Sequence, residues 1–453
     1  MAELLESDVI TWAETALGGK VIECTRQSRD NGGRPAWFIT CRNGSGPTRY
    51  YIRGNRGPSF EYNSIYSLDR EARLLKVLKK HGVPVPGVVA ESSNPYAVIL
   101  EFVDGQDDFT LITDQKERDE YGRQFAEIMA RWHAIPVGEF EKIGFLIPKT
   151  GEEYLVQDLD VWEKGCFPHL KEPVPLVTFA CQWLRRNPPR PPAPVLAQGD
   201  TGPGQFIFKD GRIQAVVDWE LAFVGDPTNE LARIRTRDMW YPTGNLPKWF
   251  RYYSEYSGTP LELDKLRYYS VIAMMTTALA LGPVAQRLDP RDVHAEWIAE
   301  EIWSKRATIE CLAEAIGVKL TPPAIPRPQE SRLSALFDVL EENLRDEQFP
   351  RIQDRFLRYR MSMDLRLLTH IRHLTEFGRE IEADDLDDMK PILGRRPKDR
   401  REGMTAMDEF VRRAGPEMDA ELTRYFYRHA MREEAVMRGA MGRIENAVVS
   451  SVA

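Results

Sequence analysis

Cysteine is scarce in this sequence, and the few cysteines are far apart. They stand at Cys24, Cys41, Cys166, Cys181 and Cys311, with no Cys-x-x-Cys pair among them. One Cys-x-x-His spacing joins Cys166 to His169, but no second pair stands near it to complete a tetrahedral metal site. The scarcity argues against a zinc ribbon and against a disulfide framework, and it favours reduced, buried thiols.

The sequence also lacks a strong charge of either sign. Its 61 basic and 69 acidic side chains leave a net charge of −8 over 453 residues. A protein that coats nucleic acid should carry a basic footprint, so we expect no nucleic acid as a partner. The acidic N-terminal stretch Met-Ala-Glu-Leu-Leu-Glu-Ser-Asp does not resemble a signal peptide, and we expect a cytoplasmic protein with no membrane partner.

Hydrophobic sequence, in contrast, is ample. Hydrophobic residues make up 42% of the chain and aromatic residues 10%, which is enough to build well-packed cores. A chain of 453 residues is too long for one ordinary domain and predicts two or three.

The first part of the chain, residues 1–104, predicts a small α+β lobe. A helical pattern over residues 1–20 precedes β-rich stretches between residues 21 and 53, which turn-forming residues separate. A helix over about 64–82 and two further strands that end at Val103 complete the predicted lobe.

Helical periodicity dominates the rest of the chain. Residues 105–320 predict a larger helical lobe that a β-hairpin interrupts near 195–220. The segment 321–330 contains four prolines and predicts a stiff, extended linker. Beyond it, residues 331–453 predict a separate all-helical domain.

Two carboxylates at the predicted hairpin are the first candidates for chemistry. Asp200 and Asp218 each follow an apolar run, and the turn Lys209-Asp-Gly-Arg212 between them is of the type that closes a hairpin. Both acids should therefore lie at the mouth of one hairpin. One can accept a proton from a substrate hydroxyl while the other holds Mg²⁺ against nucleotide phosphates.

Three motifs in this region resemble those of the aminoglycoside-phosphotransferase-like family of the protein-kinase-like fold. They read Gln198-Gly-Asp200-Thr-Gly-Pro-Gly-Gln205, Asp218-Trp-Glu220 and Gly225-Asp226-Pro227, in the order and spacing of the family. The resemblance covers residues 20–320 and implies a bilobal α+β fold, with a nucleotide-binding N-lobe and a catalytic, substrate-binding C-lobe. It also implies ATP as the donor, Asp200 as the catalytic residue that orients the acceptor hydroxyl, and Asp218 as the main Mg²⁺ ligand.

One position departs from the family pattern, which has asparagine where this chain has Gln205. Glutamine offers the same carbonyl oxygen one methylene further out, so Gln205 can still reach a metal ion, with a different geometry. The resemblance thus implies Gln205 as a second metal ligand. It leaves open whether the second metal is held differently or the site is weakened.

The N-lobe carries the expected phosphate contact. Arg53 stands where the fold usually places a cation over the α- and β-phosphates, and Glu71 on the following helix is its expected partner. A surface ion pair of little energetic value is the alternative interpretation of these two residues.

The backbone is expected to supply the other nucleotide contacts. Gly32 and Gly33 belong to a glycine-bearing turn that should lie over the phosphates, because glycine allows close backbone approach. The resemblance implies that the segment from Glu101 to Val103 is the hinge between the lobes, whose backbone meets the adenine ring.

The sequence gives weaker evidence for the acceptor site than for the nucleotide site. Arg233 and Arg237 share one face of the helix predicted after Gly-Asp-Pro, and they can meet an anionic substrate. A solvated or core-supporting helix face is the simpler explanation for the same pattern.

Residues 331–453 resemble a small helical domain that accompanies some of these phosphotransferases. A companion of this kind occurs beside a kinase of 4-hydroxyacyl-CoA thioesters, and this association favours a hydroxyacyl-CoA as the small hydroxylated substrate. Interaction with a partner, self-association into a homo-oligomer and closure of the substrate site stay open as its role.

Two alternative functions remain. An aminoglycoside-like antibiotic or another small alcohol can be the acceptor of the same reaction. A catalytically weak nucleotide-binding scaffold with a helical interaction tail is the alternative of another class, and Gln205 is its support.

Overall fold

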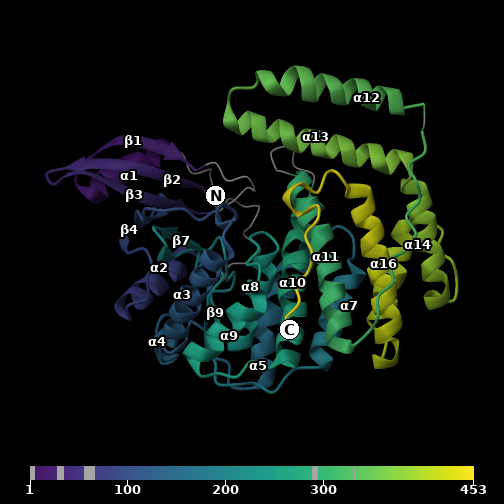
Figure 1. The fold of residues 1–453 in the computed structure, drawn as a ribbon, viewed down its shortest axis with the longest axis horizontal. Helices are drawn as coiled ribbons and strands as arrows, with labels where there is room; N and C mark the ends of the chain where they lie inside the picture. The colour runs from purple at the N-terminus through teal and green to yellow at the C-terminus, as the bar shows by residue number, and fades with distance from the viewer. Residues whose placement is uncertain (1–5, 28–34, 56–66, 288–293, 331, 453) are drawn as a thin grey trace.

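The structure is a computed structural model that describes the chain except for residues 1–5, 28–34, 56–66, 288–293, 331 and 453. Figure 1 shows a β-rich lobe at one end, a helical body beside it, and the helices of the C-terminal part across the top and along the far side of that body. Gly32 and Gly33 lie outside the described residues, so their contact with the phosphates stays a prediction.

The β-rich lobe is built on one five-stranded antiparallel sheet of order β1-β2-β3-β5-β4. Its strands are β1 (Lys20–Arg26), β2 (Ala36–Asn43), β3 (Gly46–Gly54), β4 (Val88–Ser93) and β5 (Tyr96–Glu101). Successive side chains of a strand point to opposite faces, and each face has its own helix. Helix α1 (Glu6–Leu17) packs with Ile52 and Ile99, whereas α2 (Leu68–Lys80) packs with Val98 and Leu100 on the other face.

Helix α2 places an acid inside an apolar stripe. Ser67 caps its N-terminus by accepting a hydrogen bond from the Arg70 N–H, and the buried side of the helix includes Leu68, Ala72 and Leu75. Glu71 is buried on that same side. A buried carboxylate is costly unless it is paired, so this position requires a cation nearby.

The larger lobe is helical, with two short two-stranded sheets set into it (Figure 1). Its helices are α3 (Gln115–His133), α4 (Gly138–Glu141), α5 (Gly151–Leu155), α6 (Val161–Cys166), α7 (Pro175–Arg186), α8 (Pro227–Asp238), α9 (Leu246–Ser257), α10 (Leu263–Ala285) and α11 (His294–Ile316). Strand β6 (Val195–Ala197) pairs with β9 (Phe223–Gly225), and β7 (Phe206–Lys209) pairs with β8 (Arg212–Val216). The rings of Phe206 and Phe208 pack against Phe109 and Tyr121, which anchors the β7–β8 hairpin in an aromatic core.

Helix α10 is long and apolar enough, by length and composition, to cross a membrane. In this structure 78% of its most hydrophobic 18-residue window is buried inside the protein, and the helix packs against α8 and α11. That environment is typical of the central helix of a folded core.

Residues 318–330 form neither helix nor strand, and further helices follow them. These are α12 (Ser334–Glu342), α13 (Arg355–Glu376), α14 (Gly378–Leu393), α15 (Arg400–Val411) and α16 (Asp419–Met437). The Phe426 ring of α16 stacks on Phe179 of α7 with centroids 5.6 Å apart, and Thr178 Oγ1 donates a hydrogen bond to Asp408 at 2.6 Å. Because the rings of Phe179 and Phe426 are buried, the C-terminal helices share one hydrophobic core with the helical lobe.

Candidate active site

A cleft of about 1040 Å³ lies between the two lobes and extends to the C-terminal helices. It is lined by nearly all the residues that the sequence motifs single out, namely Arg53, Glu71, Glu101, Val103, Asp200, Gln205, Asp218, Arg233 and Arg237. Residues nearly two hundred positions apart in the chain thus meet in one cavity, as expected of a binding or catalytic site.

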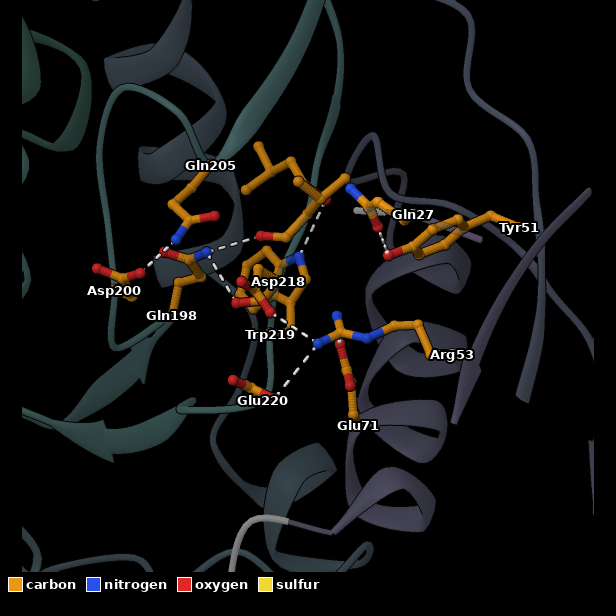
Figure 2. A network of polar contacts seen from close by, with 12 residues as sticks. Gln27, Tyr51, Arg53, Glu71, Gln198, Asp200, Gln205, Asp218, Trp219 and Glu220 are labelled. Atoms are coloured by element: carbon orange, nitrogen blue, oxygen red, sulfur yellow. Dashed lines mark hydrogen bonds and ion pairs between the residues drawn. The ribbon is translucent and has the colours of Figure 1, made fainter. Parts of the chain in front are cut away.

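Arg53 sits at the centre of a cluster of acids (Figure 2). One of its terminal nitrogens contacts Glu71 Oε1 at 2.8 Å, and the other contacts Asp218 Oδ1 at 2.9 Å and Glu220 Oε2 at 3.3 Å. The Arg53 side chain is buried. Burial by itself lowers the pKa of Arg53, but Glu71, Asp218 and Glu220 outweigh it and raise the pKa above its ordinary value.

The cluster therefore links strand β3, helix α2 and the segment after β8. The pair of Arg53 and Glu71 is not a solvated surface ion pair, because both side chains are buried. Among the described residues, three carboxylates converge on this one guanidinium.

Asp218 has a backbone conformation that is rare for residues other than glycine. Its φ is +62°, in the left-handed region that aspartate tolerates better than most side chains. Gln198 stabilises this turn, since its Nε2 donates to the carbonyl oxygens of Val217 at 2.7 Å and of Asp218 at 3.1 Å. Backbone strain of this kind often marks functional positions.

Asp200 lies on the loop between β6 and β7, on the far side of Asp218 from Arg53 (Figure 2). Its carboxylate accepts a hydrogen bond from Gln205 Nε2 and lies 3.5 Å from Arg237 Nη1. Burial, together with the nearby charge of Asp218, raises the pKa of Asp200, although Arg237 and Gln205 act in the opposite direction. An aspartate with a raised pKa is suited to accepting a proton.

A buried glutamate of α8 fixes the loop that carries Asp200. Glu230 accepts hydrogen bonds from the Gln198 N–H at 2.8 Å and from the Thr201 hydroxyl. Asp226 begins α8 by accepting from the Thr228 N–H at 2.8 Å. Through Glu230, helix α8 holds the loop of Asp200 at two points.

The two arginines of α8 have different surroundings. Arg237 Nε donates to the Pro203 carbonyl at 3.1 Å, which ties it to the loop of Asp200. Arg233 is buried, and its guanidinium lies over the Phe223 ring, 5.4 Å from the centroid. Its Nε donates no hydrogen bond to the residues that the structure describes. A buried guanidinium without a full set of partners can bind an anionic or carbonyl group.

At the opposite end of the cleft lies the segment that joins the lobes. The Glu101 carboxylate is held by Lys79 Nζ and by the Gly87 N–H, each at 2.9 Å. These bonds lower the pKa of Glu101. The Phe102 ring carries the Arg49 guanidinium 3.7 Å from its centroid, so the side chains of this segment are engaged by neighbours.

A comparison with protein families gives a match over the part of the chain that contains much of this site. Residues 44–269 match the model of the phosphotransferase enzyme family. This part of the chain is similar to that family. The matched range begins just before β3 and ends in α10, so it contains Arg53, Asp200 and Asp218.

Solved structures show the same architecture. A Ralstonia eutropha protein assigned as an aminoglycoside phosphotransferase is 19% identical with a TM-score of 0.53, and the match covers 70% of this chain and 100% of that one. A mutant of the aminoglycoside phosphotransferase APH(4)-Ia, solved with AMP-PNP and hygromycin B, is 18% identical with a TM-score of 0.50 and covers 69% of this chain. These likenesses confirm the predicted kinase-like fold, and the phosphotransferase match leaves the C-terminal helices outside it.

The curated relatives are longer proteins, and this chain matches only a part of each. Acyl-CoA dehydrogenase family member 11 of Rattus norvegicus is 25% identical over 337 residues, which is 69% of this chain and 42% of that protein. The human protein of the same name is 26% identical over 243 residues, 50% of this chain and 31% of the relative. The chain therefore spans less than half the length of these relatives.

The residues of the phosphotransferase site fit a magnesium ion. Among the described residues no group of three or more His, Cys, Asp or Glu side chains is arranged to hold a metal ion. Magnesium usually takes only one or two protein carboxylates, with substrate phosphates and water completing its shell. Asp218 supplies such a carboxylate, and Gln205 Oε1 accepts no hydrogen bond from the described residues because the amide nitrogen faces Asp200.

Sequence motifs missed some residues of the site. Glu220 lies in the Asp218-Trp-Glu220 motif, and the structure pairs it with Arg53. Gln27 and Tyr51 hydrogen-bond each other at 2.7 Å at the edge of the cleft. Residues of α11 and α13 also line the cleft, and no motif in the sequence points to them.

Proposed function

We propose that this chain is an ATP- and Mg²⁺-dependent phosphotransferase whose acceptor is the hydroxyl of a small metabolite, with a hydroxyacyl-CoA thioester as first choice. The observation that carries the proposal is the meeting of Asp200, Asp218 and the Arg53–Glu71 pair in one cleft. One carboxylate can accept a proton while the other binds a metal ion, and a buried arginine can neutralise phosphate charge.

In the proposed reaction Asp200 orients the acceptor hydroxyl. The bond from the hydroxyl oxygen to the γ-phosphorus forms as the bond between that phosphorus and the β–γ bridging oxygen breaks, so ADP leaves. The hydroxyl proton passes to Asp200 and then to solvent. Arg53 steadies the α- and β-phosphates, and Asp218 with Gln205 would hold Mg²⁺, whose chemistry is to neutralise charge on the phosphate oxygens.

The choice of ATP is supported by the AMP-PNP in the APH(4)-Ia complex, whose fold this chain shares. The choice of acyl-CoA acceptor is supported by the names of the curated relatives, which are acyl-CoA dehydrogenase family members. It is also supported by the cations near Asp200. Arg233 and Arg237 of α8 both line the cleft, and guanidinium groups can bind an anionic part of an acceptor.

A single screen tests the proposal. Purified full-length protein is given ATP and Mg²⁺ with 4-hydroxyacyl-CoA thioesters, the free hydroxy acids, simple alcohols or aminoglycosides, and ADP release is measured. We expect hydroxyacyl-CoA thioesters to accelerate ADP release most. If aminoglycosides accelerated ADP release more, an aminoglycoside-like compound would be the acceptor instead of a hydroxyacyl-CoA. If no acceptor accelerated it, the nucleotide-binding scaffold would be the better explanation.

The C-terminal part supports a second proposal, that two copies of the chain associate through α12 and α13. These helices lie side by side along one edge of the molecule (Figure 1). Their exposed apolar residues are Leu333 before α12, Leu336, Val339 and Leu340 on α12, and Leu357, Ile371 and Leu374 on α13, with exposed fractions of 37% to 64%. A nine-residue helix with no buried residue gains little stability alone.

Charge favours a second copy as the occupant of this apolar face. Helix α12 carries Asp338, Glu341 and Glu342, whereas α13 is rich in arginine. Within one chain Arg372 already contacts Asp338 at 2.8 Å and Glu341 at 3.2 Å. An acidic and a basic helix in one chain allow a self-complementary two-fold pairing, α12 of each copy against α13 of the other.

We therefore expect the protein to be a dimer in solution and the Leu336→Glu variant to be a monomer, because a carboxylate at the centre of the apolar face opposes its burial. Light scattering coupled to size-exclusion chromatography measures the mass. Leu146→Glu, at a residue that is half exposed elsewhere on the surface, is the matched control and should stay dimeric. A monomeric wild-type protein would contradict the proposal.

A further inference from the structure

The cleft does not end with the two lobes. Its lining continues onto the C-terminal helices through Tyr359, Ser362, Met363 and Arg366 of α13, and through Gly442 and Arg443 close to the C-terminus. These residues lie outside the matched phosphotransferase range of 44–269. The C-terminal part of the chain thus contributes a wall to the cavity that holds Asp200.

Part of this end of the cleft is apolar. Ala273, Ala280 and Leu281 of α10 line it together with Trp297 of α11 and Met363 of α13. The hydroxyls of Thr276 and Thr277 on α10 already donate hydrogen bonds within the helix, to carbonyl oxygens one turn earlier. A surface of this composition binds the carbon chain of a ligand better than a sugar or a phosphate.

Two carboxyl groups of α11, Glu296 and Glu300, interrupt the apolar lining. Glu300 of α11 lines the cleft, and its side chain forms no hydrogen bond or ion pair with the part of the chain that the structure describes. Glu296, one turn earlier on α11, is bound to Arg366 of α13. Arg366 is thus a cation of this wall that pairs with Glu296 and not with Glu300.

The surroundings of Glu300 favour its protonated form. Burial, followed by the negative charge of Glu296 on the same helix, raises the pKa of Glu300 to about 8, while Arg237 of α8 and Arg366 of α13 oppose the shift and Asp200 adds to it. Arg443 is the further charged group at this end of the cleft. At neutral pH the carboxyl therefore carries a proton and can donate a hydrogen bond.

We propose that the acceptor binds in a subsite that α13 helps to build, with its carbon chain against Ala280, Trp297 and Met363 and a carbonyl oxygen accepting a hydrogen bond from the Glu300 carboxyl. The inference rests on the proposed phosphotransferase function and adds to it the location of the acceptor chain. It gives the C-terminal helices a direct part in substrate binding, besides the part in self-association proposed above.

Changes at Glu300 test the polar contact in the full-length protein. Loss of one hydrogen bond in Glu300→Ala should raise the KM for a 4-hydroxyacyl-CoA about tenfold, with the KM for ATP unchanged. Glu300→Gln keeps an N–H donor and should retain acceptor affinity. In the wild type kcat/KM for the acceptor should fall above about pH 8 as Glu300 loses its proton, whereas Glu300→Gln should not show this fall.

Filling the subsite tests the wall. Ser362→Trp projects a large ring from a residue of α13 that lines the cleft and should raise the acceptor KM by about tenfold or more, most for the longest acyl chains. Asp364→Trp introduces the same ring two residues later at an exposed position and should leave the acceptor KM unchanged. Equal effects of the two tryptophans, or none, would overturn the proposed wall.

Failure of this inference is distinguishable from failure of the proposed function. Calorimetric binding of a 4-hydroxyacyl-CoA, without ATP, measures the subsite independently of turnover. If the wild type phosphorylates the acceptor while Glu300→Ala and Ser362→Trp bind it as tightly as the wild type does, only the subsite is wrong. If no acceptor binds or reacts with the wild type, the proposed function fails and the subsite with it.

Discussion

Replacing Asp200 by asparagine should reduce acceptor-dependent ADP release by roughly 10²- to 10⁴-fold, the usual contribution of a positioned acid or base. Asparagine has the size of aspartate but cannot accept the hydroxyl proton. The hydrogen bond that Gln205 donates to Asp200 can be kept by the amide oxygen, and the Pro203 carbonyl still holds Arg237. The loop should therefore keep its shape, and nucleotide affinity should stay at the wild-type value.

The pH profile provides a second measurement on the same residue. Burial raises the pKa of Asp200, and the proposed role needs the carboxylate. Activity of the wild type should therefore fall as the pH drops through this raised pKa, at a higher pH than for an ordinary aspartate. Wild-type turnover by Asp200→Asn, measured as ADP release, would remove this residue from the mechanism.

Much of the site could be predicted from the sequence because its residues stand in local motifs. The spacing of Asp200, Gln205 and Asp218 is set within one stretch of chain, and the Lys209–Arg212 turn joins β7 and β8 as the pattern predicts. Glu71 is recognisable because an acid in the buried stripe of an amphipathic helix requires a partner. The structure supplies Arg53 as that partner.

Contacts between distant segments were not predictable in the same way. Strand β6 pairs with β9 and not with the hairpin beside it, and strands of three residues carry no pattern that selects a partner. The wall that α13 contributes to the cleft depends on tertiary packing alone.

The left-handed backbone at Asp218 was also beyond prediction, and it determines how the metal site is best tested. Its φ of +62° would be strained with alanine, whereas asparagine tolerates this region. Asp218→Asn therefore removes the charge while keeping the turn that Gln198 holds. Glu71 and Glu220 remain to pair Arg53, so the fold should be retained.

With Asp218→Asn we expect Mg²⁺-dependent nucleotide affinity to fall by more than the roughly 10- to 100-fold that loss of an outer-shell partner typically costs. Titration of an ATP analogue with Mg²⁺ and with EDTA separates the two contributions, since binding without the metal should change little. Asp210→Asn is the matched control, because Asp210 is the other non-glycine residue with positive φ in the described part of the chain, at +50°, and lies in the exposed hairpin turn. If nucleotide binding by Asp218→Asn depended on Mg²⁺ as in the wild type, Glu220 would be the metal ligand instead of Asp218. In that arrangement the carboxylate must leave Arg53 when the nucleotide binds, so Glu220→Gln should then abolish the Mg²⁺ dependence.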